Sequence, residues 1–134
     1  MRTLLIVTAV LEAGTGLSLL LLPSLPVSLL FGASLDTPAA LTMARLCGTA
    51  LLSLGMVCWA ARNERPGHAL TGLVVALLFY NTAAVVLLVA YSGIGFKSSG
   101  GGLWPAVLLH TGLAIWCINS LRIARLQPGA IVGK

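Results

Sequence analysis

Four long apolar stretches, separated by short polar or proline- and glycine-rich segments, organise the chain. They cover residues 4–22, 41–61, 69–90 and 103–121. Each has roughly 20 residues, which at about 1.5 Å per residue can cross a hydrocarbon core about 30 Å thick. Helices are the expected conformation, because the backbone polar groups must be satisfied inside each segment in lipid. The pattern predicts an all-α, polytopic membrane protein whose four transmembrane helices form an antiparallel bundle.

The segment between the first two stretches, residues 23–38, is apolar but too short to cross a membrane. It contains Pro23 and Pro26 and ends its apolar part at Phe31-Gly32. This pattern predicts an interfacial turn, a short helix or a shallow re-entrant piece on the outer face. The segment is either a simple connector or a lid over an opening between helices. The four stretches leave no room for a second domain, so residues 1–134 are expected to form one transmembrane domain.

The composition excludes several classes of protein. Lys and Arg number 8 and Asp and Glu number 3, so that 8% of the 134 residues are charged and 58% are hydrophobic. Soluble domains carry about 25% charged residues. A soluble enzyme, a disordered chain and a nucleic-acid-binding protein are therefore excluded. The net charge of +5 indicates attraction to anionic membrane lipid.

The distribution of positive charge predicts the orientation. With the N-terminus in the cytoplasm, the outer side holds Lys97 and Asp36. The inner side then holds the other basic residues, namely Arg2, Arg62, Arg65, Arg122, Arg125 and Lys134. Because short loops rich in Lys and Arg stay in the cytoplasm, we expect both ends to be cytoplasmic, in a bacterial inner membrane. The first stretch is expected to be a retained helix, because Glu12 interrupts it and no small-x-small cleavage site follows.

Each apolar stretch contains one strongly polar residue: Glu12, Arg45, Asn81 and His110. A charged side chain at mid-membrane costs about 2.5–3.5 kcal/mol on insertion scales. Counted by helix rise, the four residues lie roughly 6–15 Å below the outer surface and form one polar layer. Such a layer either fixes the register of the helices, as buried polar groups can do, or forms a site for a ligand or a proton.

Arg45 is expected to need a buried partner or to reach toward the outer surface, because the second stretch has few Leu and Val residues to offset its insertion cost. Helical spacing puts further polar residues on the same faces, and both faces are expected to point into the bundle. These faces are Thr8, Glu12 and Thr15, and Arg45, Thr49 and Ser53. Side chains lean toward the N-terminus of their own helix, so Glu12 and Arg45 lean apart. Water or another residue of the layer would then bridge them.

Metal and catalytic motifs are not found in the sequence. His110 has no partner at HxxxH or HxxE spacing, and the three cysteines form no CxxC pair. His110 is either a satisfied core residue or part of the site formed by the polar layer. We assign no metal ligand and no catalytic residue. The cofactor is left unassigned, with a quinone or a lipid as the compatible ligands of the layer.

Two motifs resemble a known family. The segment LLPSLPVSLLFG (21–32) and the segment ARLCGTALLSLG (44–55), which contains Arg45-x-x-Gly48, are similar to the DoxX-like superfamily. That resemblance covers roughly residues 4–121 and implies a small four-helix membrane protein. Some members of the superfamily are small membrane subunits of quinone-linked oxidoreductases. It implies no catalytic residue, because no catalytic motif of the family matches this chain.

Three classes of function remain open. The first is an accessory or ligand-binding subunit of a membrane complex, possible partners being other membrane subunits or further copies of the chain. The second is a small oligomeric transporter or proton-coupled carrier, which needs a water path from Glu12 to both faces. The third is a membrane enzyme on a lipid-soluble substrate, which needs Glu12, Arg45 and His110 around a closed cavity.

Overall fold

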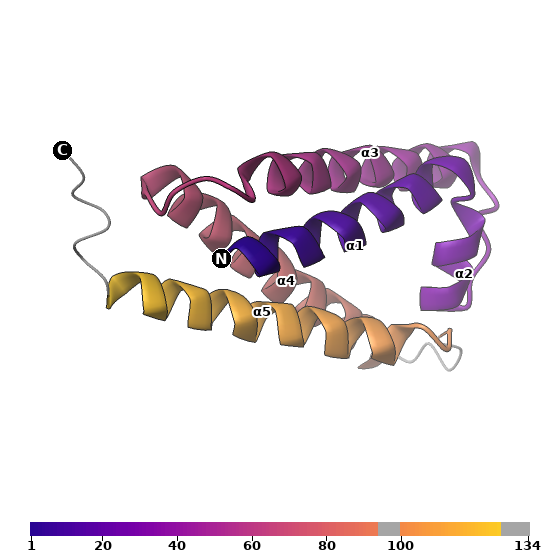
Figure 1. Ribbon diagram of the computed structural model, residues 1–134. Helices are drawn as coiled ribbons and strands as arrows, with labels where there is room; N and C mark the ends of the chain where they lie inside the picture. Colours follow the sequence, from indigo (N-terminus) through magenta and orange to yellow (C-terminus); the bar gives the residue numbers. More distant parts are fainter. Residues whose placement is uncertain (94–99, 127–134) are drawn as a thin grey trace.

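Five helices make up the described part of the chain, which covers residues 1–93 and 100–126 of a computed structural model. They are α1 (Arg2–Leu21), α2 (Ser24–Phe31), α3 (Pro38–Ala61), α4 (His68–Gly93) and α5 (Leu103–Arg125). Figure 1 shows α1 and α3 running together, α5 along the opposite side, α4 crossing obliquely behind, and α2 at one end. The predicted all-helical fold is confirmed. Lys97 and Lys134, which enter the charge distribution above, lie outside the described residues.

Helices α1, α3, α4 and α5 are each long and apolar enough to span a membrane. Their lipid-facing surfaces carry large apolar side chains in the open, with Phe79 76% and Leu108 72% exposed. A water-soluble protein rarely leaves so much contiguous apolar surface uncovered. Both the lengths of the four helices and their exposed apolar side chains are those of an integral membrane protein.

Several helices extend beyond the apolar stretches in the sequence, and two of these extensions have a clear physical cause. α3 begins at Pro38, three residues earlier than expected, because the Thr37 side chain accepts a hydrogen bond from the Ala40 amide at 3.1 Å. Threonine at the N-cap and proline in the first turn both favour a helix start. α5 continues beyond its apolar stretch and has Arg122 and Arg125 in its last turn. Basic residues there interact favourably with the negative end of the helix dipole.

Helices α1 and α3 pack with their backbones in close contact. A Cβ atom added at Gly16 would lie 2.6 Å from the Gly48 carbonyl oxygen and 2.6 Å from the Leu52 amide nitrogen. A Cβ atom at Gly55 would lie 2.9 Å from the Ala13 amide nitrogen. Small residues at these positions bring the two backbones into contact, which is the common way of packing helices in lipid. α4 packs mainly on α5, so that the bundle consists of two helix pairs.

The apolar segment between α1 and α3 contains the short helix α2, as expected from the sequence. α2 is capped at its C-terminal end by Gly32, which has φ 64° and ψ 15°, the left-handed conformation that glycine adopts at helix ends. The Leu29 carbonyl accepts a hydrogen bond from the Gly102 amide at 2.8 Å, and the Phe31 ring meets the Tyr91 ring edge-on at 4.7 Å. α2 is thereby attached to α4 and to the start of α5.

Two buried apolar clusters form the core of the bundle. The larger draws on α1, α3, α4 and α5 and contains Leu4, Leu5, Ala9, Cys58, Leu70, Val74, Leu77, Leu113 and Cys117. The smaller joins α4 to α5 through Leu88, Leu103 and Val107, with Phe31 of α2 packed against it. Along α4, Tyr80 and Asn81 lie between the two clusters, and so does His110 along α5. The polar residues therefore separate one apolar cluster from the other.

Candidate functional site

Glu12 is a buried carboxyl group in the middle of α1, with 4% of its surface exposed. The Tyr80 hydroxyl of α4 donates a hydrogen bond to Glu12 Oε2 at 3.3 Å. This distance is longer than the 2.5–3.0 Å that is usual for an O–H donor and an oxygen acceptor. The bond joins the two helix pairs, and the carboxyl group keeps acceptor capacity for a further donor.

Asn81 and His110 form the second polar contact of the bundle. The Asn81 side-chain nitrogen donates to the Leu77 carbonyl at 2.8 Å, and Asn81 Oδ1 lies 2.8 Å from His110 Nδ1. A carbonyl only accepts, so the amide nitrogen must face Leu77 and the amide oxygen must face the ring. Nδ1 therefore carries the proton and donates to Asn81.

This pairing determines what the other ring nitrogen can do. In a neutral imidazole with the proton on Nδ1, Nε2 is an acceptor. No residue in the described ranges is hydrogen-bonded to Nε2 of His110. No fully enclosed side-chain nitrogen or oxygen lacks a partner in the same ranges, so Nε2 of the half-buried His110 is not fully enclosed. His110 thus offers a free hydrogen-bond acceptor inside the membrane span.

An aromatic contact links the two polar pairs into one cluster. The Tyr80 and His110 rings meet edge to face, with ring centres 5.7 Å apart and planes at 81°. The adjacent residues Tyr80 and Asn81 serve different neighbours, Tyr80 reaching α1 and Asn81 reaching α5. We call Glu12, Tyr80, Asn81 and His110 the polar cluster. Thr8 is also buried, one turn before Glu12 on α1.

The structure does not place Arg45 in this cluster, and no partner for its side chain is found among the described residues. Arg45 is exposed, and so are Thr49 and Ser53 on the same face of α3. The hydroxyls of Thr49 and Ser53 donate to the carbonyls of Arg45 and Thr49, at 3.0 and 2.8 Å. Hydroxyls bonded in this way to their own helix need no partner from the bundle.

The physical reason is that a different face of α3 packs against α1. Ala44, Gly48 and Gly55 are buried there and allow the close backbone contact. Arg45 follows Ala44 directly and so lies about 100° further around the helix. Thr15 of α1 is likewise exposed, whereas Thr8 and Glu12 of the same expected face are buried. The small residues, and not the polar ones, mark the inward face of α3.

Tyr80 is the cluster residue that the sequence analysis missed. It lies in the middle of α4, whereas tyrosines of membrane proteins gather at the two interfaces. A buried tyrosine hydroxyl usually has a hydrogen-bond partner. Its position next to Asn81 is the signal by which it could have been found.

Metal binding is not indicated by the described residues. Among residues 1–93 and 100–126, no three His, Cys, Asp or Glu side chains gather so that they could hold a metal ion. Comparisons of the chain with protein-family models, with curated proteins and with solved structures found no match. The hydrogen-bonding capacity of the polar cluster is therefore the guide to function.

Proposed function

We propose that the protein is a membrane-embedded binding subunit that holds the headgroup of a lipid-soluble ligand at the polar cluster. The ligand class that the cluster fits is one with a hydroxyl donor on a flat ring, such as a hydroquinone. His110 Nε2 and the Glu12 carboxyl group would accept the donor, and the Tyr80 ring would lie beside the bound ring. The isoprenoid or alkyl tail would remain in lipid.

The observation that carries this proposal is the free acceptor at His110. Asn81 fixes the proton on Nδ1 at 2.8 Å, which leaves Nε2 as a lone-pair acceptor that is not fully enclosed. A hydroquinone presents O–H donors, whereas its oxidised quinone presents carbonyl acceptors. Two acceptors facing each other gain nothing, so the reduced form should bind better. Arg45, whose guanidinium could donate to a quinone carbonyl, is exposed on α3 and lies outside the polar cluster.

The proposal places the protein within a larger assembly. Resemblance to the DoxX-like superfamily supports a role as a subunit near quinone chemistry. The exposed polar face of α3, with Arg45 at one end, is the surface we assign to another membrane subunit or to a second copy. A charge that faces lipid is costly, and an acidic group of a partner would reduce that cost.

Binding to the two redox forms of one ligand tests the proposal. Calorimetric titration of the detergent-purified protein with decyl-benzohydroquinone, under anaerobic conditions, should give tighter binding than titration with the quinone form. His110→Phe removes the acceptor but keeps a flat ring, so it should reduce that preference several-fold, up to about tenfold for one hydrogen bond.

Leu108→Ala is the matched control for that experiment. Leu108 lies two residues before His110 on α5 and is exposed to lipid, so its truncation should leave the preference unchanged. Melting curves establish that each variant is folded. Equal affinity of the wild-type protein for both forms, or an unchanged preference in His110→Phe, would contradict the assignment.

The proposed orientation is both ends in the cytoplasm of a bacterial inner membrane, and cysteine labelling tests it. Ser34 and Asn63 are exposed at opposite ends of α3. In a background with Cys47, Cys58 and Cys117 replaced by alanine, a membrane-impermeant maleimide should label Ser34→Cys on intact cells. Asn63→Cys should react only after the membrane is opened. The reverse pattern would overturn the orientation.

A further inference from the structure

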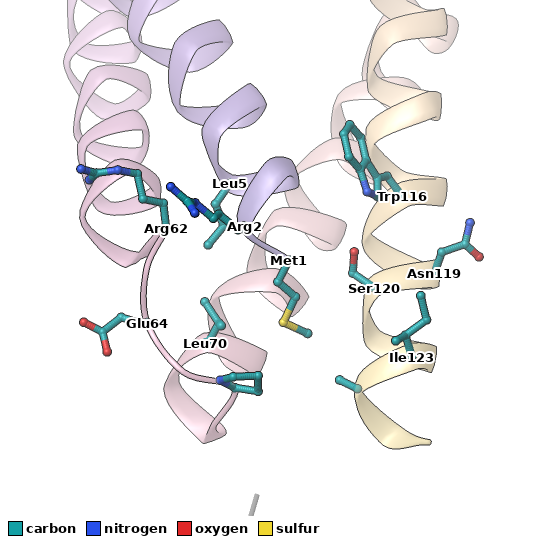
Figure 2. A pocket seen from close by; sticks show the side chains of 12 residues that line it. Met1, Arg2, Leu5, Arg62, Glu64, Leu70, Trp116, Asn119, Ser120 and Ile123 are labelled. Atoms are coloured by element: carbon teal, nitrogen blue, oxygen red, sulfur yellow. The ribbon is translucent and has the colours of Figure 1, made fainter. Parts of the chain in front are cut away.

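A second site lies at the arginine-rich end of the bundle, away from the polar cluster. Figure 2 shows it between the start of α1, the turn from α3 to α4 and the end of α5. The cavity has a volume of about 560 Å³, within the range of about 300–1,000 Å³ that is common for small-molecule sites. None of its lining residues belongs to the polar cluster. It is therefore a separate site.

The charged groups of this cavity are mainly positive. Arg2 and Arg62 line it together with Glu64. The Arg62 guanidinium lies 4.1 Å from the centre of the Trp59 ring, and it donates a hydrogen bond to the Trp59 carbonyl. Arg2 is exposed, and no acceptor in the described ranges is bonded to it. Its guanidinium is thus available to a ligand, with Arg62 held in place beside the cavity.

A buried hydroxyl on the α5 side is also without a partner. Ser120 is 7% exposed, and its hydroxyl has no hydrogen bond to any residue of the described ranges. Because no fully enclosed side-chain oxygen there lacks a partner, this hydroxyl must open onto free space. Ser120 lines the cavity, and Figure 2 shows its side chain on the side of α5 that faces the start of α1. A buried polar group without a partner is unfavourable unless a ligand or a water molecule forms a hydrogen bond with it.

We propose that this cavity binds the phosphate headgroup of an anionic phospholipid. Guanidinium groups match phosphate oxygens in charge and geometry, and Ser120 would donate to the phosphate or to a glycerol oxygen. Leu5, Leu70 and Ile123 provide apolar walls that suit the start of an acyl chain. Basic pockets between transmembrane helices are known sites for anionic headgroups.

The position of the cavity favours a lipid over a free anion. It lies where the spans end, at the level at which headgroups sit, and Trp116 lines it. Tryptophan prefers this interfacial level because its ring is apolar and its N–H is polar. A free phosphate would use the arginines but would leave the apolar walls unoccupied.

Thermal stabilisation by added lipid tests the proposal on the full chain. Purified protein in detergent is melted with short-chain phosphatidylglycerol, with phosphatidylcholine of the same chain length, or with inorganic phosphate. Phosphatidylglycerol should raise the melting temperature most, and inorganic phosphate should not raise it. Arg2→Gln and Ser120→Ala should each weaken the phosphatidylglycerol effect, with about tenfold more lipid needed for the same shift.

Arg125→Gln is the matched control for the loss of one positive charge. Arg125 lies in the last turn of α5 at the same end of the bundle but does not line the cavity. It should keep the full response to phosphatidylglycerol. An equal loss in Arg125→Gln, or equal stabilisation by phosphatidylcholine, would show a general surface effect and overturn the site. Stabilisation by inorganic phosphate to the same degree would overturn the assignment to a lipid.

Discussion

Alanine at Gly16 is expected to destabilise the protein, whereas alanine at Gly14, half a turn earlier on α1, is expected to leave it stable. A Cβ atom at Gly16 would lie 2.6 Å from backbone atoms of Gly48 and Leu52, and at Gly14 it would meet nothing within 4 Å. Backbone atoms cannot swing aside, so α1 and α3 must separate. Overpacking of this kind costs about 1–3 kcal/mol.

Melting of the two variants in detergent measures this difference. Alanine in a helix interior gains up to about 1 kcal/mol over glycine in propensity, so Gly14→Ala should melt at or above the wild-type temperature. Gly16→Ala should melt below it despite the same gain. If both variants melted alike, α1 and α3 would not be in backbone contact at Gly16.

The substitution Asn81→Leu is also expected to lower the free energy of unfolding strongly. The Asn81 side chain is only 1% exposed, and leucine removes both of its hydrogen bonds. The His110 Nδ1–H would then lose its acceptor. Leaving a buried donor unpaired costs about 1–3 kcal/mol, whereas replacing both partners by apolar groups can be nearly neutral. The double variant Asn81→Leu, His110→Leu should therefore be more stable than the sum of the single effects predicts.

A double-mutant cycle on unfolding in detergent gives this coupling directly. Comparable pairs in membrane proteins average about 0.6 kcal/mol, with a maximum of about 1.7 kcal/mol. Thr82→Val is the control, since Thr82 follows Asn81 on α4, is exposed, and donates to the Leu78 carbonyl of its own helix. Additive effects of the two leucine substitutions would mean that Asn81 and His110 do not interact in the folded protein.

The membrane spans could be predicted from the sequence because the length of an apolar stretch is set by the thickness of the bilayer. Helix rise also predicts a similar depth for Glu12, Asn81 and His110, and all three belong to the polar cluster in the structure. Depth along a helix depends only on residue count. Rotation about the helix axis depends instead on packing against neighbouring helices, which no local sequence pattern determines.

Arg45 shows how rotation was misjudged. The expectation took polarity as the sign of an inward face, but Ala44 and Gly48 occupy that face because close packing of backbones needs small residues. Helix α3 carries a face of small residues and a face of polar residues, and only one of the two faces can pack against α1. Tyr80 was missed for a related reason, since its role depends on the approach of α1 to α4, which no local pattern encodes.

The pairing of α1 with α3 and of α4 with α5 has a consequence for how the protein is made. In each case the partners are successive membrane spans, so α1 and α3 can close on each other while the ribosome is still synthesising the rest. The Tyr80 hydroxyl, which bonds to Glu12, arrives only with α4. A nascent chain stalled before α4 would hold a carboxyl group in lipid without its hydrogen-bond donor. The completion of this hydrogen bond therefore distinguishes the finished bundle from its unfinished precursor.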